Sequence, residues 1–448
     1  MSPKSVPPTM HRKEGPPPDG LLFGASVDRE PEQTDAEGLP VPADNWVAWR
    51  QVGRMERTHV AGPEPQPRLG FWERPEEALD RAAEAGCTTF LMPIEWARVH
   101  PHPGVSGPDS AVLARYAAVA AACGHRQLEP VVSLHHFTHP GWLGEDFWLR
   151  PDAPARVRIW VERVVGALGG SVRHWITLGE VNSLVVRSWL AGTLPPGRTL
   201  AFVDASLALD NLLCGHVVSY EAIHAEQPDA EVTMTTGPGR VYEFDGMMAD
   251  LLVARSEGVC VADLDAWIAQ RRVRYDTAFP ALGPGERLVR RLGAAWSSYG
   301  ARGMGRAGRP SRLPRRAIDA LYGSPHPRTL DVLGLSLTAP IEWAVGRLRG
   351  SGALGATGPV NRPPDLARWL IGRHSLTPGL PIWVVDGAPA TDVGRDQALR
   401  ENVGAVMVAT DAQVPVTRFW HRMEAGDAGA YGAVIAGLHR GDRSVLGA

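Results

Sequence analysis

The residue of this chain that is best placed to do chemistry is the glutamate Glu180. It follows Gly179 at the end of a β-rich run over residues 172–178, and the pattern after it becomes helical. In an α/β barrel, the point where a strand gives way to a loop is the catalytic end. A carboxylic acid held there can give a proton to an oxygen of a bound substrate. Position alone equally fits a solvated loop residue or a neighbour of a helix N-cap, so the surrounding residues must decide.

Histidines form a second group of candidates. A predicted strand over residues 128–134 runs directly into His135 and His136, and His139 follows. Three histidines could ligate a metal ion, but on alternating or irregular backbone they would not converge without a further ligand. We therefore expect no metal and no other cofactor.

A spaced pattern surrounds Glu180: Trp175, Thr177, Glu180, Trp189, Gly192, Pro196 and Gly197. This pattern resembles family 1 of the glycoside hydrolases, the retaining β-glycosidases. Their fourth barrel strand reads W-x-T-x-N-E-P and is followed by G-Y-x-x-G-x-x-P-G. The resemblance implies that Glu180 is the acid/base glutamate, although the preceding Asn of the family is Gly179 here and the following Pro is Val181.

Other predicted strand ends resemble the same family in the same order along the chain. Residues 21–27, LLFGASV, resemble its opening F-x-W-G-A-A-T, and residues 90–104 resemble its second strand. His136 matches the histidine that binds the sugar, so the resemblance implies a small, sugar-like substrate. The candidate substrate-binding residues are His136, His135, Phe137, Gly179, Trp420, Asp427, Glu424 and Glu95.

Several residues that the family uses for catalysis are replaced. Leu91 stands where the family has the arginine that pairs with the nucleophile, and Ser336 stands where it has an asparagine. The nucleophilic glutamate falls on Val385, and Asp386 comes directly after it. Retaining hydrolysis needs two carboxyl groups about 5–5.5 Å apart. Without gaps in the alignment, this chain keeps the first and lacks the second.

Three hypotheses about function remain open. In the first, Glu180 is a general acid and base for a sugar-like, acetal or polyol substrate, without a covalent glycosyl-enzyme. The reaction would be an inverting hydrolysis, an elimination, a cyclisation or a rearrangement. In the second, an ordinary retaining β-glycosidase uses Asp386 as a displaced nucleophile, which requires a β-bulge because a one-residue shift reverses side-chain direction. In the third, the barrel mouth binds a carbohydrate or metabolite without catalysis. We favour the first, since a binding protein has no chemical need for the acid.

These hypotheses make a prediction about the surroundings of the glutamate. Glu180, His136, Asp386 and Trp420 are expected around one barrel mouth, at the carboxyl ends of the strands. A general acid near neutral pH needs a raised pKa, which burial among apolar groups can supply. We therefore expect Glu180 in a deep, largely apolar pocket. The apolar residues expected beside it are Leu91, Leu337 and Val385.

Predicted strands and helices alternate along the chain, the pattern of a parallel sheet covered by helices. Together with the strand-end series it predicts an α/β fold, a (β/α)8 TIM barrel, as one domain over residues 21–448 after a disordered leader over 1–20. An arginine-rich insertion over 238–328 is expected above the barrel mouth, either as a solvated surface or as a site for an anionic or bulky substrate group. The predicted strands cover residues 21–27, 88–94, 128–134, 172–178, 231–236, 329–337, 381–386, 414–420 and 433–438.

Composition excludes several classes of function. The chain has 448 residues, 44% of them hydrophobic, and a formal net charge of -3. This balance predicts no nucleic-acid partner, and no apolar run approaches the ~18 residues of a membrane-spanning segment. Four cysteines lie far apart without C-x-x-C spacing, which argues against a disulfide framework and a zinc site. A reducing, cytoplasmic setting is therefore expected, with the oligomeric state left open.

Overall fold

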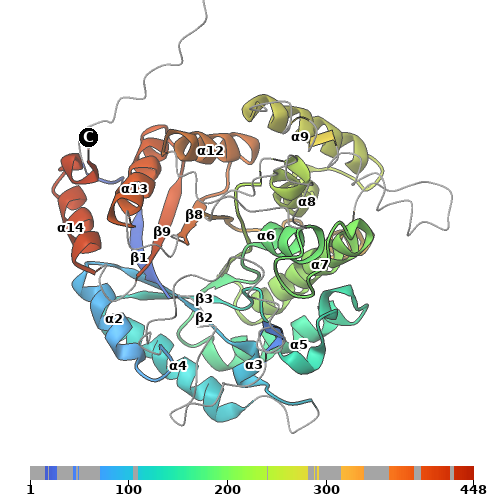
Figure 1. Ribbon diagram of the computed structural model, residues 1–448, viewed down its shortest axis with the longest axis horizontal. Coiled ribbons are helices and arrows are strands. Elements are labelled where there is room, and N and C mark those ends of the chain that lie inside the picture. Colours follow the sequence, from blue (N-terminus) through green and yellow to red (C-terminus); the bar gives the residue numbers. More distant parts are fainter. Residues whose placement is uncertain are drawn as a thin grey trace, which may run out of the picture.

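A computed structural model describes residues 16–18, 20–27, 44–46, 49, 71–103, 109–239, 241–280, 287, 290–291, 314–337, 363–387, 395–423 and 428–447. In this part of the chain, parallel strands form a barrel that is surrounded by helices (Figure 1). Most of the predicted leader over 1–20 lies outside the described residues. The candidate site residues Glu424 and Asp427 lie outside them as well.

The barrel wall is one parallel sheet with the order β5-β4-β3-β2-β1-β9-β8-β7-β6 among the described residues. Its two ends, β5 (Glu231–Thr233) and β6 (Thr235–Thr236), are pieces of one strand interrupted at Met234, so the sheet closes on itself as eight barrel strands. This confirms the predicted (β/α)8 fold. The other strands are β1 (Leu22–Ser26), β2 (Thr89–Pro93), β3 (Glu129–Ser133), β4 (His174–Ile176), β7 (Leu333–Ser336), β8 (Ile382–Asp386) and β9 (Val416–Arg422).

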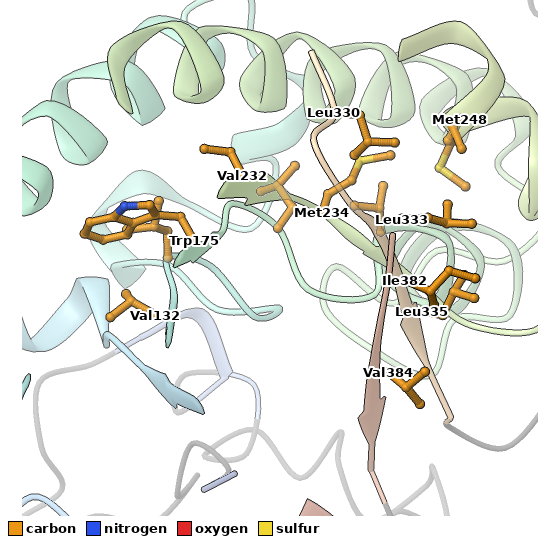
Figure 2. Close-up of a cluster of buried hydrophobic side chains, with 14 of the residues drawn as sticks. Val132, Trp175, Val232, Met234, Met248, Leu330, Leu333, Leu335, Ile382 and Val384 are labelled. Atoms are coloured by element: carbon orange, nitrogen blue, oxygen red, sulfur yellow. The ribbon is translucent and has the colours of Figure 1, made fainter. Parts of the chain in front are cut away.

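Helices pack on the outer face of this barrel (Figure 1). Their apolar faces meet the outward-facing residues of the strands, as Figure 2 shows for Met248 of α8 (Gly246–Ala254), which lies near Leu333. Local signals set some helix starts. The side chain of Asp109, for example, accepts hydrogen bonds from the backbone N–H groups of Ala111 and Val112 and so caps the N-terminus of α4 (Ser110–His125). The main covering helices are α2 (Pro75–Glu84), α4 (Ser110–His125), α5 (Ala153–Leu168), α7 (Phe202–Glu226), α12 (Pro363–Leu376), α13 (Arg395–Asp411) and α14 (Ala428–His439).

The prediction of a last strand over residues 433–438 is wrong, because this segment lies inside helix α14. Its buried residues, Tyr431, Val434, Ile435 and Leu438, recur at helical spacing. A further strand also has no place to pair, since β9 already pairs with both β1 and β8. The apolar run therefore covers the barrel from outside.

The segment over 238–328 is partly helical where the structure describes it. It contains α8, α9 (Leu264–Ala278) and α11 (Arg315–Gly323), and these helices lie beside α7 and α12 in the outer ring (Figure 1). Several of its arginines have structural partners: Arg290, for example, pairs with Asp276 at 2.8 Å, and Arg316 donates to the side chain of Asn211. Arginines of this segment that lie outside the described residues are Arg240, Arg302, Arg306, Arg309 and Arg312. The predicted position of the insertion above the barrel mouth, and the single domain over 21–448, stay predictions.

The barrel interior is filled in layers. Apolar side chains that include Trp383 and Trp420 pack against each other in its middle, with their ring centroids 5.4 Å apart. Below them, at the amino ends of the strands, Arg418 lies over the Trp383 ring and pairs with Glu129 and Glu231. This layer closes the bottom of the barrel, so the carboxyl ends of the strands provide the open side.

Candidate active site

A cavity of about 50 Å³ lies at the carboxyl ends of the barrel strands. It has room for roughly three to five water molecules, so only the reacting end of a sugar would enter it. Residues from β1 to β8 and from the loops that follow the strands contribute to its wall. The lining residues are Ser26, Val27, Leu91, Pro93, Ser133, His136, Ile176, Gly179, Glu180, Thr235, Ser336 and Val385.

Glu180 lies in the cavity wall at the position where β4 turns into helix α6 (Val181–Val185). Its side chain is buried, with 7% of the residue exposed. Its backbone is left-handed (φ 47°, ψ 52°), a conformation that costs a non-glycine residue of the order of 1 kcal/mol and that occurs often at functional sites. The backbone N–H of Glu180 donates to the Thr235 hydroxyl at 2.9 Å, which ties this turn to the neighbouring strand β6.

Asn182 fixes the start of the helix that follows Glu180. Its buried side-chain amide donates to the carbonyl oxygens of Gly237 and Phe244, both at 2.8 Å, and accepts the N–H of Gly237 at 2.9 Å. All three contacts reach the connection between β6 and α8. Two sets of hydrogen bonds therefore fix the backbone around Glu180: its own N–H bonds to Thr235, and the side chain of Asn182 bonds to the connection between β6 and α8.

His136 is the predicted sugar-binding residue that the structure places beside the acid. Its Nε2 atom lies 3.7 Å from Oε1 of Glu180, and its side chain remains 29% exposed toward the cavity. Gly179 makes this approach possible, because a Cβ atom at position 179 would lie only 2.7 Å from the imidazole Cδ2. The family that this chain resembles has an asparagine at the position of Gly179. Here the ring of His136 occupies the space that such a side chain would need.

This contact leads to a prediction for Gly179→Ala. We expect the substitution to push the His136 ring away from Glu180 and to lower the free energy of unfolding by about 1–3 kcal/mol, because overpacking forces neighbours to move. Urea unfolding measures the second effect, and the affinity for a substrate analogue measures the first. Gly166→Ala on α5 is the matched control, since nothing lies within 4 Å of its built Cβ. An equal response of the two variants would contradict the prediction.

The lining of the cavity is more polar than expected. Leu91 and Val385 line it as expected, but Leu337 does not. Hydroxyl groups also line it, and Ser336 donates to the same Thr235 oxygen that accepts the Glu180 N–H, at 3.0 Å. The other two hydroxyl-bearing residues of the wall are Ser26 and Ser133. The wall can therefore hydrogen-bond a polar ligand as well as desolvate the acid.

Asp386 lies outside this cavity, which corrects the expectation that it stands at the barrel mouth. Val385 faces the cavity, and because alternate residues of a strand point to opposite faces, Asp386 points outward to the helices. Its fully buried carboxylate accepts the Asn402 amide at 3.0 Å and contacts Nδ1 of His421 at 2.8 Å. The irregularity in register between β8 and β9 lies near Ile382, at the other end of the strand, so it does not turn Asp386 inward.

A structural role for Asp386 predicts a particular response to Asp386→Ala. Loss of the carboxylate would remove the acceptor that the buried Asn402 amide and the buried His421 ring share. Each such loss costs about 1–3 kcal/mol of stability. We expect a lower midpoint of urea unfolding while the affinity of the remaining folded protein for substrate is kept. A variant of normal stability that had lost all turnover would instead point to a catalytic Asp386.

The other candidate residues that the structure describes do not line the cavity. Trp420 is fully buried in the barrel interior, where its indole N–H donates to Thr89. Glu95 pairs with Arg98, at 2.5 Å. The rings of His135 and Phe137 pack on other aromatic rings, those of Trp148 and Trp46 respectively. Among the described candidates, the cavity thus brings together Glu180, His136 and Gly179.

Arg187 is a residue that the sequence reasoning missed. In the described segment from Trp175 to Ala191 it is the only residue that is not fully buried. It lies seven residues after Glu180, in the π-helical turn Val186–Leu190. Burial lowers the pKa of its guanidinium, and the negative charge of Glu180 opposes that shift. The signal in the sequence was a single cation within a long apolar run, two helical turns beyond the acid.

No group of three histidine, cysteine, aspartate or glutamate side chains that could hold a metal ion occurs among the described residues. In the same part of the chain, no helix combines the length and the apolar character that crossing a membrane requires.

Comparison with known proteins adds sequence relatives to this geometry. The sequence pattern described as "Glycosyl hydrolase family 1" matches residues 45–271. 6-Phospho-beta-galactosidase 1 of Streptococcus pneumoniae is 30% identical over 194 residues, which cover 43% of this chain and 40% of that protein. Beta-glucosidase-like SFR2, chloroplastic, of Oryza sativa subsp. japonica is 27% identical over 204 residues, or 44% of this chain and 30% of that protein. The chain thus spans about 40% of the length of the first of these relatives.

Solved structures resemble almost the whole chain. A beta-glycosidase from Pyrococcus horikoshii has a TM-score of 0.63 at 17% identity, with 95% of this chain and 96% of the other covered. The beta-glucosidase from Thermotoga maritima in complex with glucoimidazole has a TM-score of 0.66 at 15% identity, with coverages of 95% and 99%. At these identities the similarity concerns the fold.

Proposed function

Because this chain belongs to glycosyl hydrolase family 1, we propose that it acts on the acetal bond of a sugar-like substrate, with Glu180 as the general acid and base. The protonated carboxyl would give its proton to the oxygen of the leaving group as the bond from that oxygen to the anomeric carbon breaks. His136, 3.7 Å from this carboxyl, would orient a hydroxyl group of the substrate. The serine and threonine hydroxyls of the wall offer further hydrogen bonds to it.

One observation carries the finer part of the proposal. Among the described residues that line the cavity, Glu180 is the only one with a carboxylate. By the resemblance, Val385 stands at the position of the retaining nucleophile and Leu91 at that of its arginine partner, and both line the cavity. A buried leucine cannot stabilise a carboxylate, so both changes point in the same direction. We therefore propose that no covalent glycosyl-enzyme forms and that water or a hydroxyl of the substrate attacks the anomeric carbon.

The attacking oxygen must lose its own proton, and this requirement separates the possible reactions. In an inverting hydrolysis a second base removes the proton from water. Glu424 and Asp427, candidates by sequence, lie outside the described residues. In an internal rearrangement or cyclisation, Glu180 itself could take up the proton after giving its own to the leaving group. The proposal includes both routes and excludes attack by a protein carboxylate at position 385.

The experiment that tests this proposal combines product analysis with trapping. Aryl β-glycosides and metabolite extracts are incubated with the full chain, and the anomer or rearranged product that forms first is identified by proton NMR. In parallel, the protein is incubated with a 2-deoxy-2-fluoro glycoside, and the mass of the intact protein is measured by mass spectrometry to detect a covalent adduct. We expect turnover that depends on Glu180, and no adduct.

Two outcomes would contradict the proposal in different ways. A stable fluoroglycosyl adduct on any carboxylate, with retained product configuration, would establish an ordinary retaining β-glycosidase. Ligand binding without any turnover that depends on Glu180 would instead support a non-catalytic binding protein.

A further inference from the structure

The only partly exposed residue between Trp175 and Ala191 is a cation. Arg187 stands in the wall that carries Glu180, and its neighbours Val186 and Ser188 are buried. Burying even part of a guanidinium is costly unless an anion or several acceptors compensate it. Within the described residues, its side chain has no hydrogen bond and no ion pair. Its N–H donors can therefore bind a group from outside the described chain.

The backbone holds Arg187 in a fixed place. Its carbonyl oxygen accepts the N–H groups of Thr193 at 2.7 Å and of Leu194 at 3.1 Å, so the loop that follows folds back onto this turn. Residues Val186–Leu190 form a π-helical turn, a feature that is often found at functional sites. Such bonding restricts the arginine to a small region beside the acid.

Direction and charge place the guanidinium on the side of the acid. Seven residues of helix rise roughly 10 Å, so the π-helical turn that carries Arg187 follows Glu180 by about two turns of the same helical segment. Side chains of a helix lean toward its N-terminus, here toward Glu180, although Arg187 is not among the residues that line the cavity. The negative charge of Glu180 acts on the Arg187 guanidinium, and within the described residues Arg187 forms no direct ion pair with it.

From this geometry we infer that Arg187 is a specificity-determining residue that binds an anionic group, a phosphate or a carboxylate, carried by the substrate of the Glu180 site. A guanidinium presents a planar fork of N–H donors that matches the oxygens of both groups. The charged group would lie beside the acid and would not react. This inference rests on the proposed function for the location of the site, but the binding it describes does not require catalysis.

Two other arginines, Arg198 and Arg98, are already engaged in ion pairs within the protein. Arg198, on the loop after the π-helical turn, is already paired with Asp146 and Asp204. Arg98 is paired with Glu95 and lies over the ring of Trp72. Both side chains thus hold protein elements together, whereas the Arg187 charge has no such partner in the described chain.

The test measures binding, in the full chain carrying Glu180→Gln so that no probe is consumed. Isothermal titration compares 4-nitrophenyl β-D-galactopyranoside 6-phosphate, 4-nitrophenyl β-D-glucuronide and the neutral 4-nitrophenyl β-D-galactopyranoside. We expect at least one anionic probe to bind about 10-fold or more tightly than the neutral one, as a hydrogen-bonded charge pair would give. The probe that shows this preference distinguishes phosphate from carboxylate.

Substitutions then assign the preference to Arg187. Arg187→Gln is expected to remove it, while Arg187→Lys keeps part of it. Arg158→Gln is the matched control, because Arg158 is exposed on α5 and pairs with Glu162, so its loss changes the net charge equally and should leave the preference intact. A preference that survives Arg187→Gln, equal affinity for charged and neutral probes, or no binding of either anionic probe would overturn the inference. Since the variant is inactive by design, failure of the catalytic proposal would not affect these outcomes.

Discussion

Replacing Glu180 by glutamine is expected to lower turnover by about 10²–10⁴-fold, the usual contribution of a general acid or base. Glutamine has nearly the same shape but cannot give up a proton at neutral pH. The fold should persist, because the attachments of this turn use the backbone N–H of residue 180 and the side chain of Asn182. The loss should therefore appear in kcat and not in the urea unfolding midpoint.

The size of this loss should depend on the leaving group. A substrate with an acidic leaving group, such as dinitrophenol, needs little protonation and should lose least, whereas an alkyl glycoside should lose most. Glu162→Gln on the exposed face of α5 serves as the control for removal of a carboxylate. If Glu180→Gln turned over every substrate at the rate of the unmodified protein, the acid would have to be sought elsewhere.

The second large effect is expected from the double substitution Leu91→Arg with Val385→Glu. Both positions line the cavity together with Glu180, so this change places a second carboxylate opposite the acid and a cation beside it. The arginine is needed because a carboxylate buried without a partner would take up a proton. A fluoroglycoside should then label the protein once per chain, at position 385, whereas we expect no adduct on the unmodified protein.

Leu91→Arg with Val385→Gln is the control, since it has the same bulk without the nucleophile. Peptide mapping of the adduct identifies the residue that reacted. A correctly folded double variant that binds the fluoroglycoside but forms no adduct would show that position 385 does not face the anomeric carbon. The proposed absence of a nucleophile would then lose its main support.

The sequence by itself was sufficient for the barrel and for the central part of the site. Alternating strands and helices predict a parallel sheet, and the resemblance of the ordered strand ends to the family implies a barrel whose carboxyl ends meet at one mouth. Glu180 and His136 come shortly after neighbouring strands, so chain order predicts that they lie near each other, and the structure places them 3.7 Å apart. Local sequence determines such positions because each residue lies within a few residues of its strand.

Only the tertiary structure decided which way the side chains of each strand point. In β8, Ile382, Val384 and Val385 are all apolar, so the pattern does not distinguish the inner face from the outer one. Pairing with both neighbours placed Val385 in the cavity and Asp386 against α13, and the same closure left residues 433–438 without a strand to pair with. The fold-back of the loop from residue 193 onto the Arg187 carbonyl is likewise a feature of the structure alone. Side-chain directions and loop positions of this kind arise from contacts between segments far apart in the chain. The hydrophobic periodicity of a single segment therefore cannot predict them.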